Sequence, residues 1–440
     1  MTRSFSPRLA LAAVALGAWC APLAAQAPAA GAGRPAGADT LRLADLHAAA
    51  LAHDPRGAQA RLIAEQGALR LRNVRAERLP TLGLTGQAQH QSDVTSVPLP
   101  GALQPYKDTY DANVAARLRL FDPSRAARAD VERAATAEGE ARLASALHVQ
   151  RQAVNDAFFT ALLLDARRQV LAAAIAEVQA QLRQARERVA AGAALRSEAA
   201  LLEAAELTRR QELDDAETGR AVALQMLGDL TGRALAGTEV LEAPAPVAVP
   251  SAAAFDTLRT RPEFTQFARS RALVDARGAT VDAQDRPRVA AFGRTGYGRP
   301  GLNALAREFD SYWLAGVQVE WAPWDWGTAR REREALVLQR EAITTEERAF
   351  ADRLRRAALA DEAAIARLER ALAQDDAIVA LRARVLDETR ARLGEGVITA
   401  AEFIDRETDL TQARLAHEAR RVELAQARAR LLTTAGLEVR

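Results

Sequence analysis

The sequence has one cysteine, Cys20, and one lysine, Lys107, among its 440 residues. Cys20 lies in an N-terminal segment that we expect to be removed, so the mature chain offers no thiol for a disulfide, a thiolate metal site or a cysteine nucleophile. Loss of Arg3 and Arg8 with that segment reduces 59 basic residues to 57, which equals the 57 acidic residues. A net charge of zero gives no electrostatic support for a nucleic-acid partner.

Beyond the N-terminus there is no run of about 18 apolar residues, so the sequence predicts no transmembrane helix. Residues 1–29 are typical of a signal peptide, because Arg3 and Arg8 precede an apolar run and Ala27-Pro28-Ala29 offers a cleavage site. Leu23–Ala25 is a second cleavage option. Lipidation of Cys20 is disfavoured by the bulk of Trp19. An exported chain without a transmembrane helix is either soluble or held in an outer membrane by a β-barrel.

Catalytic motifs are also missing. The sequence has no G-x-S-x-G, no P-loop and no dinucleotide-binding glycine motif. Its histidines do not have the spacing of metal ligands; they are His47, His53, His90, His148 and His417. We therefore predict that the protein is not an enzyme and that it holds no cofactor and no metal.

The second half of the chain repeats the first. Three anchors recur in the same order, with nearly constant offsets of 207, 203 and 204 residues. The paired anchors are Asp54–Pro80 with Arg261–Pro287, Leu120–Arg128 with Pro323–Arg331, and Gly192 with Gly396. We predict a first structural repeat over residues 30–236, a Pro-rich linker over 237–251, and a second repeat over 252–440.

Helical patterns dominate each repeat. We expect a first helix over Leu41–Ala76 and its counterpart over Ala252–Ala283, each followed by a proline that cannot continue a helix. The helical pattern from Pro123 to Arg188 would extend roughly 100 Å at 1.5 Å per residue. A helix of that length needs a partner along its side, so the helices alone favour a coiled-coil rod.

Segments in which apolar and more polar residues alternate indicate β-strands, which a coiled-coil rod would not contain. In Tyr312–Trp321, one face carries Trp313, three small or β-branched residues and Trp321, and the other carries more polar residues. An apolar face bounded by two tryptophans is typical of an outer-membrane barrel strand. Two segments of the first half alternate similarly, whereas "RVAAFGRTGYG" alternates less cleanly. Because a membrane barrel needs at least eight strands, several copies of a four-stranded chain must contribute to one barrel.

These features resemble the TolC-type outer-membrane efflux channel family over essentially the whole mature chain. The resemblance rests on the duplication, "HDPRGAQA", "RLPTLGL" entering a strand, "LFDPSRA" and "WDWGTARRE" leaving one, and a glycine that breaks a long helix in each half. It implies a mainly α fold with a membrane β-barrel part. Three chains would form a 12-stranded outer-membrane barrel that continues as a long periplasmic α-helical barrel.

The resemblance also implies partners and a location. The expected partners are two further copies in a homotrimer, a periplasmic adaptor protein, an inner-membrane pump and outer-membrane lipid, with no nucleic acid. The expected location is the outer membrane, with a periplasmic helical extension. The implied function is export of drugs and other toxic small molecules across the outer membrane.

Carried over by position, Gly192 and Gly396 would lie at the tips of two helical hairpins, where a reversal favours a residue with positive φ. The predicted adaptor-facing tips comprise Arg188, Gly192, Ser197, Glu198, Arg392, Gly396 and Thr399. Glu402 and Asp405, three residues apart on one helix face, would form acidic rings at the narrowest part of the tunnel. Trp313 and Trp321 would belong to the aromatic girdle.

The sequence departs from the pattern of this family at the residues that close the periplasmic tip. Some family members close the tip with a tyrosine three residues before the second glycine and an arginine two residues after it. Here those positions hold Leu393 and Ile398, so that polar lock is absent. We hypothesise that Leu393 forms an apolar ring that closes by dewetting, together with Glu402 and Asp405.

Two alternatives remain open from the sequence. The chain could be the outer-membrane duct of a type I protein secretion system, because such ducts look alike in sequence. It could also be a periplasmic coiled-coil protein without a transport role, which would not require detergent for extraction.

Overall fold

The computed structural model describes residues 40–94, 105–246, 259–303 and 306–438. The predicted signal peptide lies outside these residues, as do part of the predicted linker and the start of the second predicted repeat. No helix in the described part of the chain combines the length and the apolar character needed to cross a lipid bilayer.

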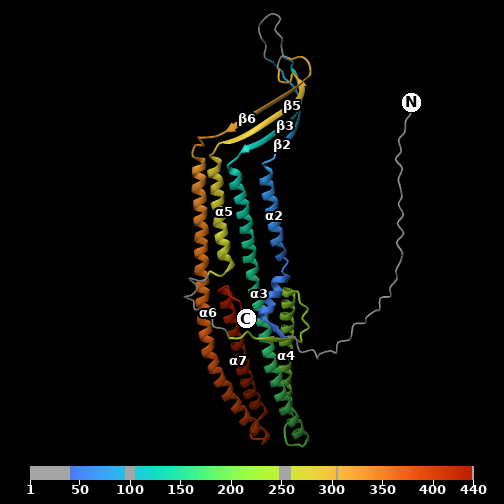
Figure 1. Cartoon of the computed structure of the whole chain (residues 1–440). Helices are drawn as coiled ribbons and strands as arrows, with labels where there is room; N and C mark the ends of the chain where they lie inside the picture. The colour runs from blue at the N-terminus through green and yellow to red at the C-terminus, as the bar shows by residue number, and fades with distance from the viewer. Residues whose placement is uncertain (1–39, 95–104, 247–258, 304–305, 439–440) are drawn as a thin grey trace, which may run out of the picture. The chain divides into compact units, whose positions relative to one another are not determined.

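From α2 in the first half and from α5 in the second, the described residues form the same elements in the same order: a helix, two strands, a long helix and a shorter helix (Figure 1). Helices α3 and α6 each have 67 residues, and the helices that follow them, α4 and α7, have 36 and 35. The first half contains α1 (Leu43–His53), α2 (Gly57–Ala76), β2 (Thr81–His90), β3 (Asp108–Phe121), α3 (Ser124–Ala190) and α4 (Arg196–Thr231). The second half contains α5 (Pro262–Gln284), β5 (Arg288–Arg299), β6 (Asp310–Glu320), α6 (Thr328–Gly394) and α7 (Ala400–Thr434).

The single helix expected over Leu41–Ala76 is wrong, because the chain breaks between α1 and α2. Pro55 disfavours a helical conformation at Asp54, which takes a ψ of 118°. The Asp54 carboxylate then accepts a hydrogen bond from the backbone N–H of Arg56 at 2.8 Å. The first residues that the structure describes form a short strand, β1 (Thr40–Arg42), which pairs in parallel with β4 (Val240–Glu242) from the predicted linker.

Strands β2, β3, β5 and β6 form one antiparallel sheet in that order (Figure 1). Leu84 lies opposite Val114, and Thr295 lies opposite both Val114 and Trp313. Directly opposed residues point to the same face, so this row belongs to an apolar face. The rows of Arg117 with Phe292 and of Arg119 with Ala290 belong to the other, polar face.

Each long helix begins at an aspartate from the repeated motif. Asp122 accepts hydrogen bonds from the backbone N–H and the hydroxyl of Ser124, at 3.0 and 2.6 Å. Asp325 accepts from the backbone N–H groups of Gly327 and Ala329, at 2.9 and 2.6 Å. The motif is repeated because the free N–H groups at both helix starts need an acceptor.

The long helices pack through three hydrophobic clusters. The largest joins α1, α3, α4 and α7 around Phe158 and Phe159, whose rings meet edge to face at 5.3 Å. A second cluster joins α6 to α7 around Leu431, which is fully buried. The third lies near the helix reversals and contains Phe403, Leu393 and Leu202. These contacts supply the lateral partner that a helix of this length requires.

Candidate functional site

The two helix reversals have the same backbone geometry. Gly192, after α3, has a φ of 72°, and Gly396, after α6, has a φ of 76°. In the first reversal Ala193 N–H donates to the carbonyl of Arg188 at 2.8 Å, and in the second Val397 N–H donates to that of Arg392 at 2.9 Å. This is the Schellman pattern of hydrogen bonds, in which glycine takes the left-handed position.

The helices that leave the reversals start differently. Thr399 precedes α7, and its hydroxyl accepts a hydrogen bond from the backbone N–H of Glu402 at 3.3 Å. Leu195 holds the same position before α4, and its side chain makes no capping hydrogen bond. Ser197, predicted near this tip, lies exposed in the first turn of α4. The repeated backbone therefore has a side-chain cap in the second copy only.

The acidic residues predicted for the tunnel lie at the start of α7. Glu402 and Asp405 are both exposed, whereas Phe403 between them is fully buried in the chain's own core. In the first copy, Glu198 is half-buried. The exposed faces of Glu402 and Asp405 are therefore available to surfaces outside this chain.

Leu393 lies in a different environment from the one that the gate hypothesis requires. Its side chain is 7% exposed and belongs to the same hydrophobic cluster as Leu202 of α4 and Phe403 of α7. A side chain that packs inside one chain is not free to form an apolar ring with other copies. The predicted contribution of Leu393 to a dewetting gate is therefore not supported, and its position indicates a packing role.

Arg188 joins the two reversals. Its Nη1 donates a hydrogen bond to the backbone carbonyl of Leu393 at 2.8 Å, across 205 residues of sequence. A Cβ at Gly396 would come within 2.9 Å of the same guanidinium. The sequence predicted Arg188 as a tip residue but did not indicate its hydrogen bond to the second reversal. Arg392, at the equivalent position of the second repeat, is exposed.

The tryptophans predicted for the girdle are exposed in the isolated chain. Trp313 of β6 is 74% exposed, and Trp321, just after β6, is 60% exposed and donates from its indole N–H to the carbonyl of Asp285 at 3.1 Å. Trp324 and Trp326 are 72% and 80% exposed. These four residues therefore do not form a buried core cluster within the chain.

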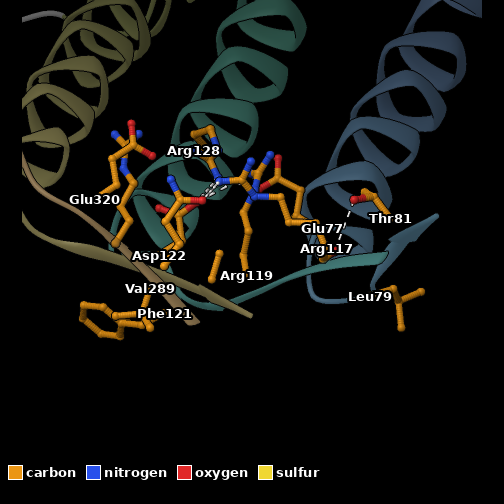
Figure 2. A pocket seen from close by; sticks show the side chains of 13 residues that line it. Glu77, Leu79, Thr81, Arg117, Arg119, Phe121, Asp122, Arg128, Val289 and Glu320 are labelled. Atoms are coloured by element: carbon orange, nitrogen blue, oxygen red, sulfur yellow. Dashed lines mark hydrogen bonds and ion pairs between the residues drawn. The ribbon is translucent and has the colours of Figure 1, made fainter. Parts of the chain in front are cut away.

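A cavity of about 450 Å³ lies where the polar face of the sheet meets α3 and the end of α2 (Figure 2). Arg128 contacts both Glu77 and Asp122 there, with 2.8 Å between Nη2 and the Asp122 carboxylate. Burial alone would raise the pKa of Asp122, but hydrogen bonds from Ser124 and Arg128 outweigh it and lower this pKa to about 2. The sequence gave no indication of this site, because its residues come from both repeats.

No family model and no curated protein matches the sequence. Solved structures match over most of the chain. The CusC structure, reported for folding and transmembrane channel formation, has a TM-score of 0.69 at 14% identity, covering 91% of this chain and 93% of that one.

The outer membrane protein VceC from Vibrio cholerae has a TM-score of 0.67 at 16% identity, covering 90% and 97% of the two chains. The open MtrE outer membrane channel of Neisseria gonorrhoeae has a TM-score of 0.59 at 19% identity, covering 91% and 90%. The chain therefore has the fold of the TolC-like outer-membrane channels.

Proposed function

We propose that this chain is the outer-membrane exit duct of a tripartite efflux system and exports drugs and other toxic small molecules. Three copies would close a 12-stranded barrel in the outer membrane and extend a helical tunnel into the periplasm. The observation that carries the proposal is a sheet with one apolar and one polar face whose strands connect to two 67-residue helices. A periplasmic adaptor and an inner-membrane pump would complete the system.

The apolar sheet face supports a membrane location. Leu84 is 82% exposed, Trp313 74% and Val319 65% in the isolated chain. Large apolar side chains gathered on one face are unfavourable in water and favourable against lipid. Trp313 and Trp321 would lie near the two membrane interfaces, where indole rings combine apolar contact with a polar group.

At the helix reversals, Glu402 and Asp405 would meet their copies from the other chains. Carboxylates arranged in rings attract cations and repel anions. We propose these two residues, without Leu393, as the selective part of the closed tip. The other predicted tip residues would contact the adaptor; they are Arg188, Gly192, Ser197, Glu198, Arg392, Gly396 and Thr399.

Fractionation and conductance test the duct. We expect the protein in the outer-membrane fraction, a trimer in mild detergent, and ion conductance in planar bilayers. A protein that is extracted without detergent and forms no channels would instead be the periplasmic coiled-coil alternative. Deletion of the gene should sensitise cells to drugs. A deletion that leaves drug sensitivity unchanged but blocks secretion of a protein would favour the type I secretion duct.

The acidic tip has its own test. The double substitution Glu402→Ala/Asp405→Ala should reduce cation selectivity, measured as the reversal potential in a salt gradient. Asp214→Ala/Asp215→Ala is the control, because it also removes two exposed carboxylates but does so in the middle of α4. Equal reversal potentials for the wild type and the tip variant would exclude the ring.

A further inference from the structure

Arginines lie along the polar face of the sheet, from the end nearest the long helices to the middle of β5. Arg117 and Arg119 lie on β3, and Arg288 and Arg294 lie on β5. Arg117 and Arg119 lie opposite Phe292 and Ala290 of β5. Arg294 is two residues from Phe292, and Arg288 is two residues from Ala290. The four arginine side chains therefore share one face of the sheet. Arg117 with Arg294 and Arg119 with Arg288 are therefore the diagonal neighbours, roughly 7–8 Å apart in each pair.

One of these arginines is neutralised by carboxylates. Arg119 forms ion pairs with Glu77 at 3.2 Å and with Asp122 at 3.7 Å. Arg128 of α3 contacts the same two carboxylates (Figure 2). Two acidic groups therefore balance two guanidinium groups, and neither carboxylate is left over for the other arginines.

The other three, Arg117, Arg288 and Arg294, are here called the arginine cluster. Within the described residues none of them makes an ion pair. Arg117 donates to the neutral side-chain oxygen of Gln318 at 3.2 Å. The Arg294 guanidinium lies 5.4 Å from the centre of the Tyr312 ring. The Nε atoms of Arg288 and Arg294 are buried and have no hydrogen-bond partner in the part of the chain that the structure describes.

Few carboxylates are near enough to compensate. Glu320, opposite Arg288, is exposed and lines the same cavity. Asp111, farther along the same face, is occupied by the Tyr312 hydroxyl and the Asn113 amide. Both donors to Asp111 are neutral, so its carboxylate keeps its charge. Three guanidinium groups against two carboxylates still leave an excess of positive charge, and such like charges repel unless an anion is bound.

We propose that the arginine cluster binds solutes that carry a phosphate or carboxylate group as they pass through the duct. Guanidinium groups offer paired N–H donors that match both groups. Arg117 and Arg288 line the cavity of about 450 Å³, which gives a small anion room, and Arg294 lies farther along the same face. The opposite face is apolar, so lipid phosphates do not reach these side chains. The inference rests on the proposed function, since only a duct would bring solutes to this face.

Planar-bilayer conductance with inorganic phosphate as the probe tests the proposal. Phosphate added at constant ionic strength should reduce the chloride current of the wild-type channel. Arg117→Gln/Arg288→Gln/Arg294→Gln should weaken this block by about tenfold and shift the reversal potential toward cations. Glu320→Gln should change both quantities in the opposite direction. Arg61→Gln is the control, because Arg61 lies exposed on α2 and pairs with Glu65.

Thermal unfolding of the detergent-purified protein gives a second readout that does not need conductance. Phosphate should raise the unfolding midpoint of the wild type and of Arg61→Gln, but not that of the triple variant. Channels that conduct normally but show no phosphate block and no phosphate-dependent midpoint would overturn the anion site and leave the duct intact. A protein that forms no channels would overturn the proposed function itself.

Discussion

The two repeats use the same backbone devices but support them with different side chains. Asp122 starts α3 with two ion-pairing arginines around it, whereas Asp325 starts α6 through backbone hydrogen bonds. The first reversal supplies Arg188, and the second supplies the carbonyl that it binds. The two repeats keep the same helix starts and helix reversals, but the side chains that stabilise the backbone there differ between them.

Truncation of a side chain that packs near each helix reversal should show the largest difference in stability between the two repeats. Leu393→Ala should destabilise the protein by about 3 kcal/mol, because it leaves a cavity in a buried cluster. Val189 holds the equivalent position in the first repeat and is half-buried, so Val189→Ala should cost about 1 kcal/mol. The comparison uses thermal unfolding in detergent, and equal losses would show that the two reversals are packed alike.

The helix starts should differ in their response to acid. The folded-state pKa of Asp122 is about 2, below the ordinary value of 3.8, so its carboxylate stabilises the protein above about pH 4. That contribution is lost as the pH falls toward 2. Asp122→Asn should lower stability by about 2 kcal/mol at neutral pH and flatten this part of the pH profile.

The pKa of Asp325 is also lowered, by hydrogen bonds from the backbone N–H groups of Ala329 and Gly327. Asp325 has no ion pair within the described residues, so Asp325→Asn should produce a smaller loss than Asp122→Asn. Unfolding midpoints measured between pH 2 and pH 7 provide the check. A larger loss for Asp325→Asn would reverse the order of the two helix starts.

The glycines at the reversals should be unequal as well. A Cβ added at Gly192 would have no atom within 4 Å. Gly192→Ala should therefore lower the free energy of unfolding by about 1 kcal/mol, the cost of a left-handed conformation at alanine. Gly396→Ala carries the same cost and also displaces Arg188, so it should cost about 2 kcal/mol. Combining Gly396→Ala with Arg188→Ala should remove the excess; if it does not, the contact with Arg188 is not its cause.

The helix caps should give the smallest effects. Thr399→Ala removes the hydroxyl that accepts from Glu402 N–H and should cost about 1 kcal/mol. Leu195→Thr should stabilise the first copy by about 0.5 kcal/mol, because the extended backbone at Leu195 already suits a capping residue. Leu195→Val, which adds no acceptor, is the control in unfolding measurements, and a matching gain for it would exclude capping.

Much of the fold could be predicted because its signals are local. The alternation in Tyr312–Trp321 indicated a strand with two unlike faces, and β6 occupies nearly that segment. The helical pattern from Pro123 to Arg188 corresponds closely to α3. Pro55 is a local signal too, but the apolar spacing on either side of it favours one continuous helix where the structure has α1 and α2.

The candidate site was predicted less well because its contacts are long-range. The alternation in the first half indicated strands with two unlike faces, but the relation of Arg117 and Arg119 to Arg288 depends on pairing between β3 and β5, which come from different repeats. The burial of Leu393 depends similarly on packing among α3, α4, α6 and α7. Spacing along one helix indicates which residues share a face, not which face meets a neighbouring helix.

The bond from Arg188 to the carbonyl of Leu393 has a consequence for how such a protein can evolve. Every residue has a backbone carbonyl, so no substitution at position 393 can delete the acceptor. Heritable loss of this bond by a single exchange must occur at position 188 or through a change in backbone path. Sequence variation that tunes the coupling of the two hairpins should therefore concentrate in the first repeat, even where its effect is felt in the second.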